Sequence, residues 1–249
     1  AMGITGTEVT KEAARMILAD DNFATIVQAV REGRAIFDNI RKFLRYLLSS
    51  NMGEVLTVFL GVVGAGVIGL SGHGEAVVLP LLATQILWIN LMTDAGPALA
   101  IGLDPPVDDA MARTPRRRGE RAIDARMWAG VLSLGLVMAL ATLLTLDLHL
   151  PGGLIEGSQT LDRARTAAFT VLVLAQLFNC FNARSETVSA LRRPFTNAWL
   201  WGAIAVSLAL QVAVVHLPVL NVAFGTVPLS PEQWLHCVAI ASSVLWFGE

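Results

Sequence analysis

Charged residues are scarce in this sequence. Asp, Glu, Lys and Arg make up 15% of its 249 residues, hydrophobic residues make up 54%, and the mean hydropathy is +0.60. Soluble domains carry roughly 25% charged residues, so the composition predicts a membrane protein rather than an ordinary soluble domain. The formal net charge is only −2. The chain therefore offers no basic domain surface, and nucleic acid is not expected as a partner.

Cysteine is also scarce, and the motifs of several enzyme classes are missing. Cys180 and Cys237 both lie in apolar runs, which favours buried small side chains over a disulfide or a metal pair. No G-x-x-x-x-G-K-[ST], H-E-x-x-H or G-x-S-x-G pattern occurs. A P-loop nucleotide site, a zinc protease and an α/β-hydrolase are therefore not indicated.

Long apolar runs dominate the sequence instead. A spanning helix needs about 20 mostly apolar residues. Six runs qualify or nearly qualify: Phe43–Leu70, Val77–Leu103, Trp128–Leu146, Ala167–Ala183, Ala198–Val215 and Trp234–Phe247. Joints that contain Gly or Pro separate them. The sequence therefore predicts an all-α membrane protein with a bundle of six transmembrane helices, embedded in a lipid bilayer.

Lys and Arg are distributed unevenly around these runs. Of the 18, seven lie before the first run or, as Arg45 does, in its first turn, six lie between the second and third, and three lie between the fourth and fifth. Only Arg163 and Arg165 fall on the other side. The positive-inside rule then places both ends of the chain in the cytoplasm with an even number of crossings. The basic stretch at 113–121 is expected to be a cytosolic loop near lipid headgroups.

The first 42 residues differ from the rest. TEVTKEAARMIL has a Thr cap and helical spacing, and RMILADD predicts a short strand that ends in two carboxylates. Asp21 or Asn22 can cap a second helix, which continues into the first apolar run without a proline. Such a helix would enter the bilayer as an unbroken rod. The alternative is a peripheral amphipathic helix followed by a loop.

Two carboxylates, Glu54 and Asp94, occur within the six runs. A charge at bilayer depth costs at least roughly 2.5–3.5 kcal/mol, so each needs a reason. Asn51 lies three residues before Glu54, and Asn90, Thr93 and Asp94 share one face of the second helix. Because a short hairpin joins the two helices, these five oxygen-bearing side chains can converge at mid-membrane.

The second run is also predicted to break its own backbone at Gly96 and Pro97. Pro97 removes a helical hydrogen bond and frees the carbonyl of Thr93, and such irregularity is tolerated only where protein or a polar cavity satisfies it. Carbonyl, carboxylate, amide and hydroxyl oxygens suit a hard cation such as Ca²⁺. The segment therefore predicts half of a cation site. The alternative is a structural network in which protonated Glu54 is hydrogen-bonded to Asn90.

A family resemblance is carried by two long stretches, AMGITGTEVTKEAARMILADDNFATIVQAVREGRAIFDNIRKFLRYLLSSNMGEV and QILWINLMTDAGPALAIGLDPP. They closely resemble P-type cation-transporting ATPases, specifically the calcium-pump branch, and the resemblance covers essentially the whole chain. It implies that residues 1–22 end a cytosolic α/β phosphorylation domain and that 23–42 form a stalk helix. Residues 43–249 would then be a transmembrane cation-transport domain holding the last six of ten helices, so the chain is expected to be part of a longer polypeptide.

The resemblance implies transport of Ca²⁺ out of the cytosol through a phosphoenzyme cycle. Asp94 would be the central ligand of a metal set carried over by motif: Asn51, Glu54, Asn90, Thr93 and Asp94. A further glutamate ligand would come from an earlier helix. The phosphorylated aspartate and the nucleotide domain, with their ATP and Mg²⁺, would lie in upstream domains of the same polypeptide. Residues 1–249 alone are therefore expected to be inactive as an ATP hydrolase.

Gln176 is a possible further metal ligand and marks a departure from part of this family. Pumps that carry two ions per cycle have an acidic residue there, whereas Gln176 resembles the plasma-membrane type, so one ion and the plasma membrane are expected. Ca²⁺ ranks before Mn²⁺ and monovalent cations. A gradient-driven carrier and a non-transporting scaffold are the other classes. The AMGITGTEV opening argues against a carrier, and the retention of Glu54 and Asp94 argues against a scaffold.

Overall fold

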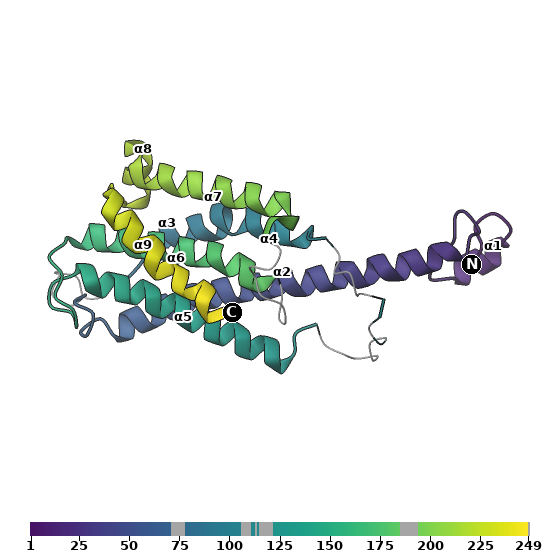
Figure 1. The fold of residues 1–249 in the computed structure, drawn as a ribbon, viewed down its shortest axis with the longest axis horizontal. Helices are drawn as coiled ribbons and strands as arrows, with labels where there is room; N and C mark the ends of the chain where they lie inside the picture. The colour runs from purple at the N-terminus through teal and green to yellow at the C-terminus, as the bar shows by residue number, and fades with distance from the viewer. Residues whose placement is uncertain (71–77, 106–110, 113, 115–121, 185–193, 249) are drawn as a thin grey trace. The chain divides into compact units, whose positions relative to one another are not determined.

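Helices form the regular secondary structure of the computed structural model (Figure 1). The structure describes residues 1–70, 78–105, 111–112, 114, 122–184 and 194–248. The predicted hairpin and the basic stretch at 113–121, apart from Thr114, lie outside these residues. The chain divides into two compact units. The first is Ala1–Ile40 with Pro105–Glu120, and the second is Arg41–Asp104 with Arg121–Glu249.

The first unit begins with a short helix, α1 (Glu8–Ala13), and a loop. Thr7 is the N-cap of α1, as predicted, and its Oγ1 accepts a hydrogen bond from the Thr10 N–H at 3.4 Å. The strand predicted over RMILADD is wrong. That segment forms only an isolated parallel bridge between Leu18 and Met2. A strand is stable only with partner strands beside it, and the described residues supply none.

Asp21 closes the loop that follows α1. Its carboxylate accepts hydrogen bonds from the N–H of Ile4 at 2.9 Å and from the N–H and hydroxyl of Thr5 at 2.8 and 2.6 Å. The Thr5 hydroxyl, followed by the Ile4 N–H, lowers the pKa of Asp21 to about 2. Asn22 instead accepts from the Ala24 N–H at 3.0 Å. Of the two predicted caps, Asn22 is therefore the one that serves the next helix.

The next helix, α2 (Ala24–Val63), is continuous over 40 residues. Its continuity through Ile40 and Phe43 confirms the predicted rod and excludes a loop before the first apolar run. The helix ends before the predicted Leu70. Turns follow as far as Gly69, whose φ of +71° is a backbone conformation that glycine adopts without strain.

The second apolar run is divided into three consecutive segments: α3 (Ala83–Trp88), η1 (Ile89–Thr93) and α4 (Ala95–Gly102). The middle segment is a π-helix, and at its end the Asp94 N–H donates to the Ile89 carbonyl, five residues back, at 3.0 Å. The break therefore lies one turn before the predicted Gly96 and Pro97. Pro97 occupies the first turn of α4, where an N–H has no partner within the helix.

The rest of the second unit is also helical: α5 (Ala125–His149), α6 (Leu161–Ala183), η2 (Pro194–Thr196), α7 (Ala198–His216), α8 (Pro218–Phe224) and α9 (Pro231–Gly248). Helix α6 packs against α5, α7 and α9, and α4 packs against α7 (Figure 1). Nearly all of α6 is buried, whereas the other long helices keep one face exposed. Helix α6 therefore forms the centre of this unit.

Within the described residues, four helices are long and apolar enough to cross a membrane: α2, α5, α6 and α7. The second predicted span is interrupted by η1, and the sixth corresponds to α9, which has 18 residues. Helix α5 exposes a large apolar side chain at every fourth position: Trp128, Leu132, Leu136, Leu140, Leu144 and Leu148. Such an outward stripe suits contact with lipid. The described chain is thus confirmed as helical with apolar spans, while six crossings remain a prediction.

Candidate cation site

Glu54 lies where three helical segments meet. It belongs to α2 and its residue surface is 4% exposed. The Asn90 amide of η1 donates to Glu54 Oε2, and the Gln176 amide of α6 donates to Oε1 at 2.9 Å. Both carboxylate oxygens therefore accept from amides. These contacts fix the orientation of the carboxylate but bring no positive charge to it.

Asp94 lies at the joint between η1 and α4 and is 1% exposed. Its Oδ1 accepts a hydrogen bond from the Tyr46 hydroxyl of α2 at 2.9 Å. Its Oδ2 is buried and has no hydrogen-bond partner among the described residues. A buried polar atom without a partner is costly. Asp94 therefore keeps the capacity to bind a positively charged ligand.

The carbonyl of Thr93 is satisfied from another helix. Pro97 lacks the N–H that would bond to it, as predicted, and Ser207 of α7 donates its hydroxyl to this carbonyl at 3.2 Å. The hydroxyl of Thr93 donates to the Ile89 carbonyl of its own segment at 3.0 Å. The break in the second run is thus held by protein contacts, and Thr93 lies fully inside the helix cluster.

Asn51 is exposed, unlike the two carboxylates. Its side chain is exposed, and its amide donates to the Leu47 carbonyl of its own helix at 2.8 Å. Asn51 and Glu54 border a groove with a volume of about 610 Å³. The other lining residues are Val55, Val58, Phe59, Val62, Val63 and Ile86. The groove is therefore an apolar surface along α2 with two polar groups at its edge.

Helix α6 adds two buried amides that bond to side chains of α2. Gln176 bonds to Glu54, and the Asn179 amide donates to the Ser49 hydroxyl at 2.7 Å. The side-chain oxygens of Gln176 and Asn179 are buried and have no hydrogen-bond partner among the described residues. Asp94 Oδ2 shares this property, and amide and carboxylate oxygens are ligands that hard cations bind.

A metal site made of acidic side chains alone is not found here. The described residues contain no group of three or more His, Cys, Asp and Glu side chains that could hold a metal. A cation at Glu54 and Asp94 would therefore depend on amide, hydroxyl and carbonyl oxygens as well. The bond from Asn90 to Glu54 is the one that a purely structural network predicts. That network does not explain the unpartnered oxygens.

Tyr46 and Ser207 were not identified from the sequence. Tyr46 is the single tyrosine of the chain and lies eight residues before Glu54, which places both on one face of α2. That spacing was a usable signal. Ser207 gave none, because a lone serine in an apolar run forms no pattern and its contact spans 114 residues.

A comparison with protein families matches residues 78–249 to the family described as "Cation transporting ATPase, C-terminus". The match covers more than half of the chain. It includes η1, α4 and every later helix, and with them Asn90, Asp94 and Gln176.

Several proteins named as calcium-transporting ATPases are similar to this chain over most of its length. "Calcium-transporting ATPase" of Bacillus subtilis (strain 168) is 41% identical over 242 residues, which are 97% of this chain and 26% of the relative. "Calcium-transporting ATPase 4, endoplasmic reticulum-type" of Arabidopsis thaliana is 35% identical over 300 residues, or 100% and 27%. "Probable calcium-transporting ATPase" of Trypanosoma brucei brucei is 38% identical over 255 residues, or 93% and 24%. The chain spans about a quarter of the length of these curated relatives.

Proposed function

Because this chain belongs to the P-type cation-transporting ATPases, as part of their C-terminal membrane region, we propose that it is the transport domain of an ATP-driven Ca²⁺ pump. The pump moves Ca²⁺ out of the cytosol through a phosphoenzyme cycle. The phosphorylated aspartate, with its ATP and Mg²⁺, lies in upstream domains of the same polypeptide. Residues 1–249 alone are then inactive as an ATP hydrolase.

The unsatisfied carboxylate of Asp94 is the observation that carries this proposal. It is buried next to a broken helix, and Oδ2 has no hydrogen-bond partner among the described residues. Glu54 is the second buried carboxylate, and amides rather than cationic groups hold it. A transported divalent cation neutralises two carboxylates and accepts the remaining oxygens as ligands. This supports a transport site more strongly than a structural network.

The proposed ligands are Asn51, Glu54, Asn90, Thr93 and Asp94, with Gln176 as a further candidate. Asp94 is the central ligand. Tyr46 fixes one oxygen of Asp94 through its hydroxyl and leaves the other for the cation. Asn90 and Gln176 hold the Glu54 carboxylate in one orientation, which lowers the entropy lost when the cation binds.

An upstream membrane helix completes this proposed site. Glu54 and Asn51 border the apolar groove along α2, and the relatives are about four times as long as this chain. A helix that covers the groove would exclude water beside Glu54 and supply a further acidic ligand, as the resemblance implies. Asn51, whose amide donates to the Leu47 carbonyl of its own helix, then turns toward that upstream helix.

Coupling to ATP is assigned to α2. In the proposed organisation, residues 1–22 end the phosphorylation domain, 23–42 form the stalk, and 43–249 form the transport domain. Helix α2 contains the stalk and Glu54 without interruption. A movement of the stalk along or across its axis is therefore passed to the carboxylate through helical hydrogen bonds rather than through a loop.

One ion per cycle is proposed because of Gln176. Its amide nitrogen donates to Glu54 Oε1, so the side chain serves the Glu54 carboxylate instead of adding a third negative charge. Two divalent cations would leave a net charge of +2 against the two carboxylates of this chain, and of +1 once the further acidic ligand from upstream is added. This argument also favours the plasma-membrane type of pump. We assign six crossings, with α3–η1–α4 and α9 joining the four long apolar helices and both ends of the chain in the cytoplasm.

The test uses the full-length polypeptide in sealed membrane vesicles. ATP-dependent uptake of ⁴⁵Ca²⁺, well above uptake of ⁵⁴Mn²⁺ and ²²Na⁺ measured in parallel, is the expected result. Preferential uptake of Mn²⁺ or Na⁺ would reassign the cation. Uptake of Ca²⁺ down a gradient without ATP would identify a carrier, and no cation uptake with intact phosphorylation would identify a non-transporting protein.

A further inference from the structure

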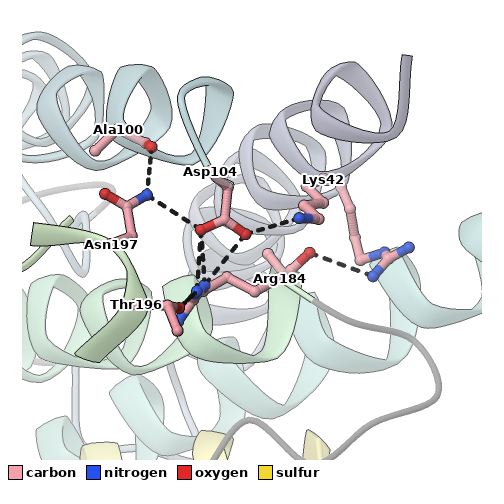
Figure 2. A network of polar contacts seen from close by, with 8 residues as sticks. Lys42, Ala100, Asp104, Arg184, Thr196 and Asn197 are labelled. Atoms are coloured by element: carbon pink, nitrogen blue, oxygen red, sulfur yellow. Dashed lines mark hydrogen bonds and ion pairs between the residues drawn. The ribbon is translucent and has the colours of Figure 1, made fainter. Parts of the chain in front are cut away.

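Another buried carboxylate, that of Asp104, lies just after the end of α4, away from the proposed cation ligands in sequence. Asp104 is 6% exposed, and Figure 2 shows Lys42, Arg184 and Asn197 directed toward it. We call these four residues the Asp104 cluster. They come from α2, the C-terminal end of α6 and the N-terminal end of α7. One side chain therefore joins four parts of the helical unit.

Two positively charged side chains form ion pairs with Asp104. Lys42 Nζ lies 2.7 Å from Oδ2, and Arg184 Nη2 lies 3.0 Å from Oδ1. Arg184 Nε adds a contact to each carboxylate oxygen, at 3.2 and 3.4 Å. The side chains of Lys42 and Asp104 are 9% and 5% exposed. Charge-assisted bonds of this kind are short and directional, so the position of Asp104 is closely fixed.

Asn197 bonds to Asp104 and to the backbone of two helices, α4 and α7. Its amide nitrogen donates to the Ala100 carbonyl of α4 at 2.8 Å and to Asp104 Oδ1 at 3.2 Å. Its amide oxygen caps α7 by accepting the Leu200 N–H at 3.1 Å. The last turn of α4 and the first turn of α7 are thus held together through one side chain.

The cluster holds the two helices that carry the buried carboxylates. Lys42 precedes Glu54 by twelve residues on the unbroken α2, and Asp104 follows Asp94 by ten residues across α4. At about 1.5 Å per helical residue, these separations are roughly 18 Å and 15 Å. A shift of α2 along α4 at the Asp104 cluster therefore moves Glu54 relative to Asp94 by a similar amount.

We infer that Asp104 is a positioning residue that sets the register of α2 against η1 and α4, and through it the geometry of the Glu54–Asp94 site. The inference rests on the proposed cation transport for its functional readout. Asp104 touches no cation itself. It acts through the ion pair with Lys42 and through the end of α4, and Arg184 and Asn197 keep it in place.

The test compares single substitutions in the full-length polypeptide. Asp104→Asn keeps the shape of the side chain and removes its charge. The Ca²⁺ concentration for half-maximal phosphorylation by ATP should rise about tenfold, the size of effect seen when a residue that orients metal ligands is lost. Phosphorylation by inorganic phosphate without Ca²⁺ should stay within about twofold, because the upstream chemistry is unchanged.

A double-mutant cycle separates positioning from general damage. Lys42→Met should shift Ca²⁺ activation in the same direction, and Lys42→Met combined with Asp104→Asn should shift it no further than the larger single change. The matched control is Asp124→Asn. Asp124 pairs with Arg41, the neighbour of Lys42 on α2, at 2.9 Å, but it lies beside α5 and is 47% exposed. Additive shifts, or equal effects of Asp104→Asn and Asp124→Asn, would overturn the inference.

Two further measurements cover the remaining outcomes. If Asp104→Asn does not accumulate in the membrane, Asp104→Glu keeps the charge and lengthens the side chain. Normal Ca²⁺ activation in that variant would refute a positioning role. If the wild type shows no Ca²⁺-dependent phosphorylation, the proposed function fails. The register of α2 against the second run can then be measured by the yield of a disulfide between Val55→Cys and Ile86→Cys, because these two positions line one groove. An unchanged cross-linking yield after Asp104→Asn would refute the inference.

Discussion

Two groups of buried carboxylates in the helical unit differ in their partners: one has cationic partners and the other has neutral hydrogen-bond donors. Asp104 accepts contacts from a lysine, an arginine and an asparagine. Glu54 and Asp94 accept from two amides and a phenol, and one oxygen of Asp94 has no hydrogen-bond partner among the described residues. Burial alone therefore does not mark a cation site. The proposed site differs in that one Asp94 oxygen has neither a fixed counter-charge nor a hydrogen-bond partner among the described residues.

The largest expected effect in this comparison is that of Asp94→Asn. The substitution keeps the shape and removes one charge from a site that must neutralise a divalent cation. It should abolish Ca²⁺-dependent phosphorylation by ATP in the full-length pump, a loss of about a thousandfold or more in Ca²⁺ affinity. Phosphorylation by inorganic phosphate without Ca²⁺ should survive.

Asp162→Asn is the control for this change, because Asp162 is an exposed residue in the first turn of α6. It should leave both reactions unchanged. If Asp94→Asn weakened Ca²⁺ activation no more than Asp104→Asn does, the two clusters would not differ in kind.

Glu54→Gln should have the next largest effect. The neutral amide still fills the space between Asn90 and Gln176, but this chain then contributes only one negative charge to the site. The Ca²⁺ concentration for half-maximal phosphorylation should rise roughly a hundredfold, with the maximal level partly retained. A titration of phosphoenzyme against free Ca²⁺ measures both quantities. Normal activation would show that Glu54 belongs to a structural network with Asn90.

Gln176→Ala should be mild. It removes one hydrogen bond to Glu54, which is worth about 1 kcal/mol, or roughly fivefold in affinity. Direct ⁴⁵Ca²⁺ binding should give one ion per phosphorylation site in both the wild type and the variant. Two bound ions in the wild type, with one lost in Gln176→Ala, would contradict the single-ion proposal and make Gln176 a ligand.

The smallest effect is expected for the exposed ion pair of Arg41 and Asp124. The Met127 N–H, followed by Arg41, lowers the pKa of Asp124 below its usual value of 3.8. The stabilisation is therefore present above pH 3.8 and is lost as the pH falls through the lower pKa of the folded state. Asp124→Asn should lower the midpoint temperature of thermal unfolding by about 2 °C or less at pH 7.

The pH dependence of this pair provides its own check. The difference in thermal midpoint between the wild type and Asp124→Asn should begin to shrink below about pH 3.8 and should disappear once the pH lies below the lowered pKa of the folded state, where both side chains are neutral. A large difference that persists in acid would mean that Asp124 stabilises the start of α5 by something other than its charge.

Local and periodic features of this fold could be predicted from the sequence. The apolar runs locate the helices, the absence of proline predicts the continuous α2, and Thr7 caps α1. Asn179 and Asn182, two polar side chains in an apolar run, form contacts between helices. Asn179 bonds to Ser49, and Asn182 donates to the Val244 carbonyl at 2.8 Å. Each of these features depends on near neighbours or on a polar side chain in an apolar run.

Features that depend on distant partners could not be predicted. Asp104 lies in a Gly- and Pro-containing joint, and nothing local shows that Lys42 and Arg184, 62 and 80 residues away, reach it. The break in the second run was placed at Gly96 and Pro97. Proline marks the lost hydrogen bond but not the turn that opens, which also depends on how Ser207 holds the Thr93 carbonyl.

The π-helix η1 holds one more residue per hydrogen-bonded turn than an α-helix does. The segment therefore contains one residue more than an α-helical turn would need, and we call this extra residue the slack. Taking up that slack would turn Asp94 by about 100° and advance it by about 1.5 Å relative to α3. The cost would be small, because one backbone hydrogen bond is exchanged for another. A carboxylate could thus be swung toward or away from its ligand by a change of winding alone. A cation-bound structure that keeps the bond from Asp94 to Ile89 would show that the slack is not used.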